Sequence, residues 1–197
     1  MPKRLFFDLT TLKQDTILEA AFAEFSHTEF DQSSINQIIK QANIARGSFY
    51  LYFEDKEDLV LTLLKYVLTK QLDRYLEQFI PPKLKPAAMY RKFIEFMFSV
   101  FDDSTYAAFF KNIYLAMNYR IKKGFEDFAL LFRQRLYTSI QTKSTLGLGQ
   151  QNPPAIAIEI VGLLTRSLFE KKLAHGVDNQ TLLNHYDDVI TFLIKQS

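Results

Sequence analysis

Hydrophobic side chains recur every three to four positions along most of the chain. This spacing places them on one face of an α-helix, and no stretch shows the alternation that is typical of a half-buried β-strand. The stripes predict helices over residues 11–26, 55–79, 87–101, 109–117, 125–140, 155–174 and 178–195, with a break expected at Gly124. Together with two short helices between residues 33 and 56, the pattern predicts an all-α protein of about nine helices.

The two short helices are joined by a very short turn. Ser34 lies three residues before Gln37, a spacing that is typical of a capping box at the start of a helix. Asn43 tolerates the left-handed backbone conformation with which helices often end, and a second helix follows directly. This arrangement predicts a helix-turn-helix, whose second helix can lie in the major groove of DNA. A small helical hairpin held by aromatic packing fits the same pattern.

The side chains of the second helix favour DNA binding. Arg46 is a permanently charged donor that suits guanine edges or phosphates. Gly47 and Ser48 keep the start of the helix slim, so that its backbone can approach DNA. Tyr50 and Tyr52 place hydroxyl groups where phosphate oxygens would lie.

Four short motifs across residues 13–65 resemble the N-terminal domain of a TetR-family transcriptional regulator. They are Ala-x-x-x-Phe, Ser-Ile-x-x-Ile, Gly-Ser-Phe-Tyr-x-Tyr-Phe and Asp-Lys-Glu-Asp-Leu. Asn43 stands where the family usually has glycine, and Ala45 stands where it usually has serine or threonine. The second difference removes a side-chain cap, at a typical cost of about 1 kcal/mol.

The resemblance implies two domains and a set of DNA contacts. Residues 1–55 would form the helix-turn-helix domain, and a long fourth helix would join it to a helical effector-binding and dimerisation domain over residues 56–197. The implied contacts with base edges come from Asn36, Arg46, Gly47 and Ser48, and the implied contacts with phosphates come from Ser34, Tyr50, Tyr52 and Lys56.

The distribution of charge argues against DNA binding. The net charge is +2, but residues 1–60 contain six Lys and Arg against ten Asp and Glu. A DNA-binding domain normally has a basic surface, so we expect few phosphate contacts and modest non-specific affinity. This acidity favours an alternative function, that of a helical protein–protein adaptor in which the helix-turn-helix is structural.

Several classes of protein are disfavoured by composition. There is no cysteine, which fits a reducing compartment, and no apolar run approaches the roughly 18 residues that a membrane span needs; we therefore expect a cytoplasmic protein with no membrane contact. The three histidines are far apart and lack metal-ligand spacing. We predict no enzymatic activity, no metal and no cofactor.

The chain before the first long helix has two interpretations. Residues 1–9 are expected to form a mobile tail. Alternatively, Lys3 and Arg4 form a basic arm that reaches DNA.

The middle of the chain is rich in phenylalanine, which indicates a core and, by the resemblance, an effector pocket within it. An apolar pocket with a few polar groups would suit a small apolar effector. The candidate residues are Phe93, Met97, Phe110, Tyr114, Met117, Phe128 and Phe132, with Asn118 or Arg166 as polar handles.

The helix over residues 155–174 is apolar nearly all round and needs cover on both sides. A second copy of the chain is the simplest cover, with Gly162 allowing close approach, although a core within one chain is the alternative. The expected interface residues are Ile156, Ile160, Leu163, Leu164, Tyr186, Val189, Ile190 and Leu193.

These inferences combine into one expected function. The chain is predicted to be a homodimeric transcriptional regulator, most simply a repressor, that binds a palindromic double-stranded DNA operator and is released by a small apolar effector.

Overall fold

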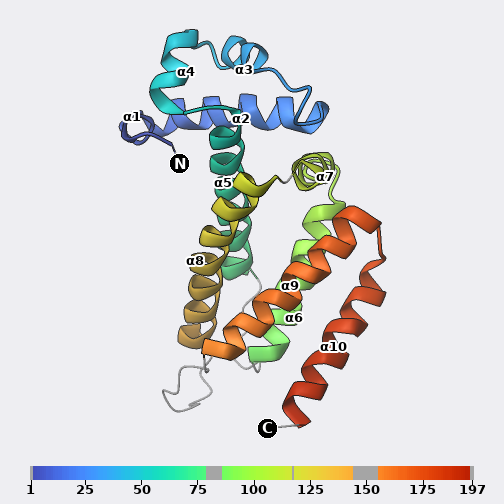
Figure 1. Cartoon of the computed structure of the whole chain (residues 1–197). Coiled ribbons are helices and arrows are strands. Elements are labelled where there is room, and N and C mark those ends of the chain that lie inside the picture. Colours follow the sequence, from blue (N-terminus) through green and yellow to red (C-terminus); the bar gives the residue numbers. More distant parts are fainter. Residues whose placement is uncertain (1, 79–85, 117, 144–154, 196–197) are drawn as a thin grey trace. The chain divides into compact units, whose positions relative to one another are not determined.

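The computed structural model describes residues 2–78, 86–116, 118–143 and 155–195. Within these residues it contains ten α-helices and no β-strand, which confirms the predicted all-α fold (Figure 1). The helices are α1 (Arg4–Phe7), α2 (Thr11–His27), α3 (Ile35–Gln41), α4 (Arg46–Tyr52), α5 (Lys56–Gln78), α6 (Pro86–Asp102), α7 (Ala107–Leu115), α8 (Tyr119–Lys143), α9 (Ala155–His175) and α10 (Asn179–Lys195).

The chain forms two compact units, each made of two separate segments. Unit 1 contains residues 1–68 and 104–128, and unit 2 contains residues 69–103 and 129–197. Both α5 and α8 contribute residues to both units. The functional division near residue 55 stays a prediction, because compactness alone does not define which residues bind DNA.

Unit 1 is built around α2. The short helices α3 and α4 lie on one side of α2, and α7 packs against it from the other (Figure 1). Its core contains large apolar side chains that are fully buried, among them Ile17, Phe25, Ile38, Phe49 and Leu59. The contribution of α7 is an addition to the predicted three-helix unit.

Two expectations for unit 1 are wrong. Residues 4–7 form the helix α1 rather than a mobile tail, because Phe6 is buried against Phe53, with ring centroids 4.9 Å apart. Gly124 does not interrupt α8, which runs from Tyr119 to Lys143. A Cβ at Gly124 would lie 2.3 Å from the Leu61 side chain, so the glycine allows α8 to approach α5 closely.

Unit 2 places α6 against α9 and α10, which also pack on each other (Figure 1). Its buried residues include Tyr75 and Tyr186, and burial raises the pKa of both hydroxyl groups. Arg91 pairs with Asp187 at 2.9 Å between α6 and α10. No helix in the described part of the chain is both long and apolar enough to cross a lipid bilayer.

Candidate nucleic-acid interface

The turn between α3 and α4 has the backbone that a tight helix-turn-helix needs. Asn43 has a φ of 50°, which confirms the predicted left-handed position. The Asn43 and Ile44 N–H groups donate to the carbonyls of Lys40 and Ile39 at 3.2 and 3.0 Å. The Lys13 ammonium on α2 donates to the carbonyls of Ala42 and Asn43 in the turn, both at 3.4 Å. The turn is therefore held both by hydrogen bonds to α3 and by Lys13 of α2.

The start of α3 differs from the prediction. The Ser34 hydroxyl makes no capping hydrogen bond, so the expected capping box with Gln37 is not formed. Instead, the Ser34 N–H donates to the Glu24 carboxylate at 2.7 Å. A carboxylate from α2 thus satisfies the free backbone donor, and the half-buried hydroxyl is not used for capping.

The predicted base-reading residues come together on one exposed surface of α3 and α4. Asn36, Arg46 and Gly47 are exposed, and Ser48 is half-buried. One Arg46 Nη donates to Asn36 Oδ1 at 2.6 Å, and the guanidinium carbon lies 6.0 Å from the centre of the Tyr50 ring. Ala45 precedes α4 without a side-chain cap, as predicted.

Gly47 has free space on the side where a side chain would lie. In the part of the chain that the structure describes, no atom beyond its own helix and chain neighbours lies within 4 Å of where a Cβ would stand. The packing of this protein therefore does not require glycine at position 47.

Of the four predicted phosphate-binding residues, Lys56 has a different role. Its ammonium donates to the carbonyls of Phe30, Asp31 and Ser33, and lies 4.6 Å from the centre of the Phe30 ring. Burial lowers the pKa of Lys56, against the opposing effect of Asp31 and Glu24. Lys56 therefore holds the loop between α2 and α3 and is not free to bind a phosphate.

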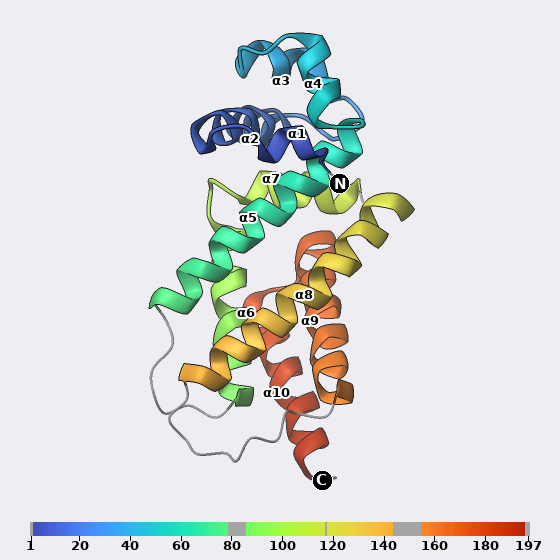
Figure 2. The ribbon, with the colours of Figure 1, turned by 90° about the vertical axis from the view of Figure 1, so that its left-hand side faces the viewer.

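The two tyrosines lie near the end of α4. Tyr50 is 40% exposed, whereas Tyr52 is half-buried with its ring centroid 6.5 Å from that of Phe6. Their backbone carbonyls both accept hydrogen bonds from Lys3, from its ammonium at 2.7 Å and from its N–H at 2.8 Å. The helix α1 accordingly lies beside the end of α4 (Figure 2). Sequence reasoning missed this contact, although the apolar run Leu5–Phe7 after a basic pair was a signal that the segment has a packing surface.

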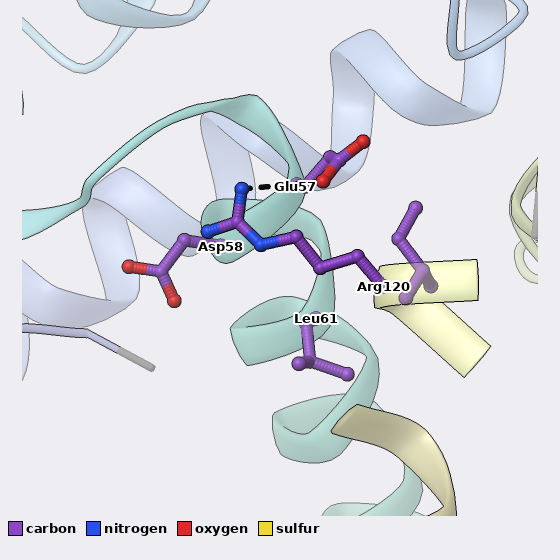
Figure 3. Close-up of a pocket in the computed structure, with 5 residues that line it drawn as sticks. Glu57, Asp58, Leu61 and Arg120 are labelled. Atoms are coloured by element: carbon purple, nitrogen blue, oxygen red, sulfur yellow. Dashed lines mark hydrogen bonds and ion pairs between the residues drawn. The ribbon is translucent and has the colours of Figure 1, made fainter. Parts of the chain in front are cut away.

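The acidic residues at the start of α5 are paired. Asp55 accepts a hydrogen bond from the Asp58 N–H at 2.9 Å, which confirms it as the cap of this helix. Arg120 on α8 forms ion pairs with Glu54 at 3.1 Å, with Glu57 at 3.3 Å and with Asp55. Figure 3 shows the pair with Glu57. Partial burial of Asp55 favours a higher pKa, but the hydrogen bonds from Asp58 and Arg120 prevail and lower it.

This pairing changes the electrostatic argument against DNA binding. Residues 1–68 contain seven basic and ten acidic residues, but residues 104–128 of the same unit add four basic and two acidic ones. Three of the ten carboxylates share the single positive charge of Arg120, and a fourth, that of Glu24, accepts a hydrogen bond from the start of α3. The acidity of the N-terminal sequence is thus largely balanced within unit 1.

The predicted effector-binding residues are divided between the two units. Phe93 and Met97 are buried in unit 2, where Phe93 contacts Phe132 with ring centroids 5.8 Å apart, and Arg166 is exposed. Unit 1 contains the buried Phe110, the half-buried Tyr114 and Phe128, and the exposed Asn118. Met117 lies outside the described residues.

Neither of the predicted polar handles is buried. Asn118 donates to Glu57 at 2.5 Å and accepts from the Ile121 N–H at 3.0 Å, so it caps α8. The pocket beside it, lined by Glu57, Asp58, Leu61, Arg120 and Ile121, has a volume of about 30 Å³ (Figure 3). A pocket of this size holds one water molecule.

Two buried polar groups in unit 2 were not predicted. Gln71 on α5 is 3% exposed, and Arg133 on α8 lies beside Gly162. Neither the Gln71 Oε1 nor the Arg133 Nε has a hydrogen-bond partner among the residues that the structure describes. The close approach at Gly162 is therefore made by Arg133 of the same chain.

The predicted dimer residues have different environments. Leu163 is 60% exposed, and Ile160, Val189 and Ile190 are half-buried. Leu164 and Tyr186, at 8% and 1% exposed, belong to the core of their own chain and offer no surface to a partner. The side chains of Ile156 and Leu193 lie outside the described part. Phe192, which was not predicted, is 64% exposed.

Comparisons with known proteins agree with the helix-turn-helix geometry. Residues 17–63 match the family model of bacterial regulatory proteins, tetR family. The uncharacterized HTH-type transcriptional regulator YvdT of Bacillus subtilis (strain 168) is 39% identical over 74 residues, which are 38% of this chain and 36% of that protein. The fatty acid metabolism regulator protein of the same organism is 36% identical over 58 residues, 29% of this chain and 30% of that protein.

These sequence matches span about a third of the length of the curated relatives. The fold as a whole is similar to the crystal structure of the transcriptional regulator FadR from Bacillus subtilis in complex with stearoyl-CoA. The identity is 21%, the TM-score is 0.59, and the alignment covers 91% of this chain and 96% of that one. The match over residues 17–63 and the geometry of α3 and α4 thus agree on a helix-turn-helix similar to that of the tetR family in the N-terminal part of the chain.

Proposed function

We propose that this protein is a homodimeric, effector-responsive repressor that binds a palindromic DNA operator through α4. In this proposal, two recognition helices enter successive major grooves about 34–36 Å apart. The observation that carries it is the exposed surface of Asn36, Arg46 and Gly47, which combines charged and polar donors with an unobstructed backbone. The same features are not needed for a protein–protein adaptor.

Gly47→Ala tests this proposal, because the substitution should change stability and operator affinity in opposite directions. The added methyl group has space in the free protein, and alanine stabilises a helix by about 0.5–1 kcal/mol relative to glycine. On DNA the same methyl group separates the helix from the base edges. We therefore expect unchanged or higher stability in urea, and weaker binding to an operator selected from random duplex DNA.

The matched control is Gly176→Ala, a glycine with a φ of 63° at the end of α9. That variant should lose stability, since alanine is strained in the left-handed region, and it should keep operator affinity wherever it is folded. Equal operator affinity of Gly47→Ala and the parent chain would contradict the proposed approach of α4 to DNA.

We propose that the effector is a molecule with a long apolar chain, bound in unit 2. The buried aromatic cluster of Tyr75, Phe93 and Phe132 supplies apolar surface. A buried polar group without a partner costs about 1–3 kcal/mol, so an effector that bonds to Gln71 or Arg133 would remove this cost. The complex of the FadR fold relative with stearoyl-CoA supports this class of effector.

The effector must bind the DNA-incompetent form more tightly than the DNA-competent form. A change from 1:99 to 99:1 needs a preference of about 5.5 kcal/mol. We propose that α5, which contributes to both units, transmits the change and alters the spacing of the two recognition helices.

Operator affinity in the presence of stearoyl-CoA tests the proposed effector class. Saturating stearoyl-CoA should weaken operator binding, whereas coenzyme A without the acyl chain should have no effect. Unchanged affinity over a series of acyl chain lengths would reject this class of effector.

A further inference from the structure

Asn36 and Arg46 are ten residues apart in sequence and lie on different helices of the helix-turn-helix. The free protein joins them: one Arg46 Nη donates to Asn36 Oδ1 at 2.6 Å. The orientation of the Asn36 amide follows from chemistry, because arginine has only donors and must face the amide oxygen. We infer that Asn36 and Arg46 read DNA as one coupled unit that presents mainly hydrogen-bond donors.

The coupling restricts what Asn36 can recognise. An asparagine that reads adenine in the major groove uses both ends of its amide, accepting from N6–H and donating to N7. In this protein the Asn36 oxygen already accepts from Arg46 with one of its two lone pairs, whereas both amide N–H groups stay available to donate. We therefore expect Asn36 to act mainly as a donor to a base acceptor, such as guanine O6 or N7, thymine O4 or adenine N7.

The coupling also limits the freedom of Arg46. The guanidinium has five N–H donors in a planar fork, and the bond to Asn36 uses one of them. The ring of Tyr50, 6.0 Å from the guanidinium carbon, lies on the same surface. With its position limited by these neighbours, Arg46 keeps donors for the paired acceptors of a guanine edge, which an arginine recognises with two hydrogen bonds.

The pair is exposed in the free protein, so water weakens it there. Exclusion of water by DNA lowers the local dielectric and strengthens hydrogen bonds between the remaining partners. The contribution of the pair should thus be larger in the complex than in the free chain. This inference rests on the proposed DNA binding, and it adds the identity of the bases and the dependence of one residue on the other.

A double-mutant cycle on a selected operator tests the coupling. Asn36→Ala and Arg46→Ala should each weaken binding about ten- to hundred-fold. If the two residues act as one unit, the double variant should lose less operator affinity than the two single fold-losses multiplied together. Gln41→Ala, an exposed amide on the same helix, is the control and should leave the affinity unchanged.

Asn36→Asp separates the two roles of the side chain. The carboxylate still accepts from Arg46, but it has no N–H to donate to a base. Selection from random duplex DNA should then keep the guanine read by Arg46 and lose the guanine or thymine preference at the neighbouring position.

The free protein provides a readout that needs no DNA. Rotation of the Arg46 guanidinium, followed by nitrogen NMR, should be slow in the parent chain and in Asn36→Asp and faster in Asn36→Ala. Equal rotation in all three proteins would overturn the coupled unit while leaving DNA binding intact, and so would single effects that simply multiply in the cycle. Failure of the parent chain to select any duplex sequence would instead reject the proposed function and, with it, this inference.

Discussion

At the scale of single residues, two neighbours at the start of α5 have contrasting environments. Lys56 is turned into unit 1, where three carbonyls surround its ammonium. Asp55 is turned toward its own helix and toward Arg120. A basic residue that follows α4 is therefore used for structure, while the carboxylates beside it pair with an arginine that lies 63 to 66 positions later in the chain.

Arg120→Gln should make the protein less stable at neutral pH by about 1 kcal/mol, the upper end for exposed ion pairs. The pKa of Asp55 lies below its ordinary value of 3.8 in the folded chain. The contribution of ionised Asp55 to the free energy of unfolding is thus fully present above pH 3.8, and it is lost as the pH falls through the folded pKa. The difference between the parent chain and Arg120→Gln in urea should therefore shrink below pH 3.8.

Lys123→Gln, which changes an exposed charge on the same helix, is the control for this experiment. This variant should show the same dependence of stability on pH below pH 3.8 as the parent chain. A stability difference for Arg120→Gln that persists undiminished at pH 2 would show that the Asp55 ion pair is not its cause.

At the scale of elements, α1 and the residue before it stabilise the C-terminal end of α4. The recognition helix has only seven residues, and its last carbonyls need partners. Lys3 supplies a cation to the carbonyl of Tyr50 at the negative end of the helix. Phe6 packs against Phe53, the residue that ends α4. The end of the recognition helix is thus held by residues that precede the first long helix.

Phe6→Ala should release α1 and loosen the end of α4. The side chain is 2% exposed, and removal of a buried phenylalanine costs about 3 kcal/mol, less where the freed segment can detach. Amide hydrogen exchange of Phe53 should become faster, and operator affinity should fall. Leu5→Ala, which removes a 51% exposed side chain from the same helix, should change neither.

At the scale of the whole molecule, the proposed dimer uses the outer surfaces of α9 and α10. Each of these helices has a large apolar side chain that its own chain leaves exposed, Leu163 at 60% and Phe192 at 64%. Exposed side chains of this kind mark interaction surfaces when they are contiguous. In the proposed dimer, each copy covers the same surface of the other, as two-fold symmetry requires.

Phe192→Asp should therefore shift the protein from dimer to monomer, measured by light scattering after gel filtration. Operator affinity should fall with it, since one subunit reaches only one half-site. Asn184→Asp changes an exposed residue of the same helix and should remain dimeric. A parent chain that is monomeric throughout would contradict the proposed assembly.

Much of the fold was predictable because the information is local. Helical spacing located the long helices to within a few residues, except α8, whose start was missed. The tolerance of asparagine for left-handed backbone identified Asn43, and Asp55 was correct as a cap. The four motifs at the N-terminus correctly indicated a sequence of the tetR type, because residues 17–63 match the family model of bacterial regulatory proteins, tetR family.

The errors concern partners that are distant in sequence. Lys56 donates to carbonyls about 25 residues earlier in the chain, and Lys3 before α1 donates to a carbonyl of α4 47 residues later. Gly124 lies against Leu61. No periodicity encodes such contacts. The effector residues stay a prediction, because a stripe of phenylalanines looks the same whether it fills a core or lines a pocket.

The packing of α7 on α2 affects any attempt to isolate the DNA-binding part as a fragment. The Phe22 ring lies 5.0 Å from that of Phe109, and the carbonyl of Phe25 accepts from Asn112 at 3.1 Å. A fragment truncated after Leu68 would keep every residue of α3 and α4 but would leave these groups on α2 facing solvent. Such a truncation should aggregate, and a soluble minimal fragment would need residues 104–128 spliced back by a linker.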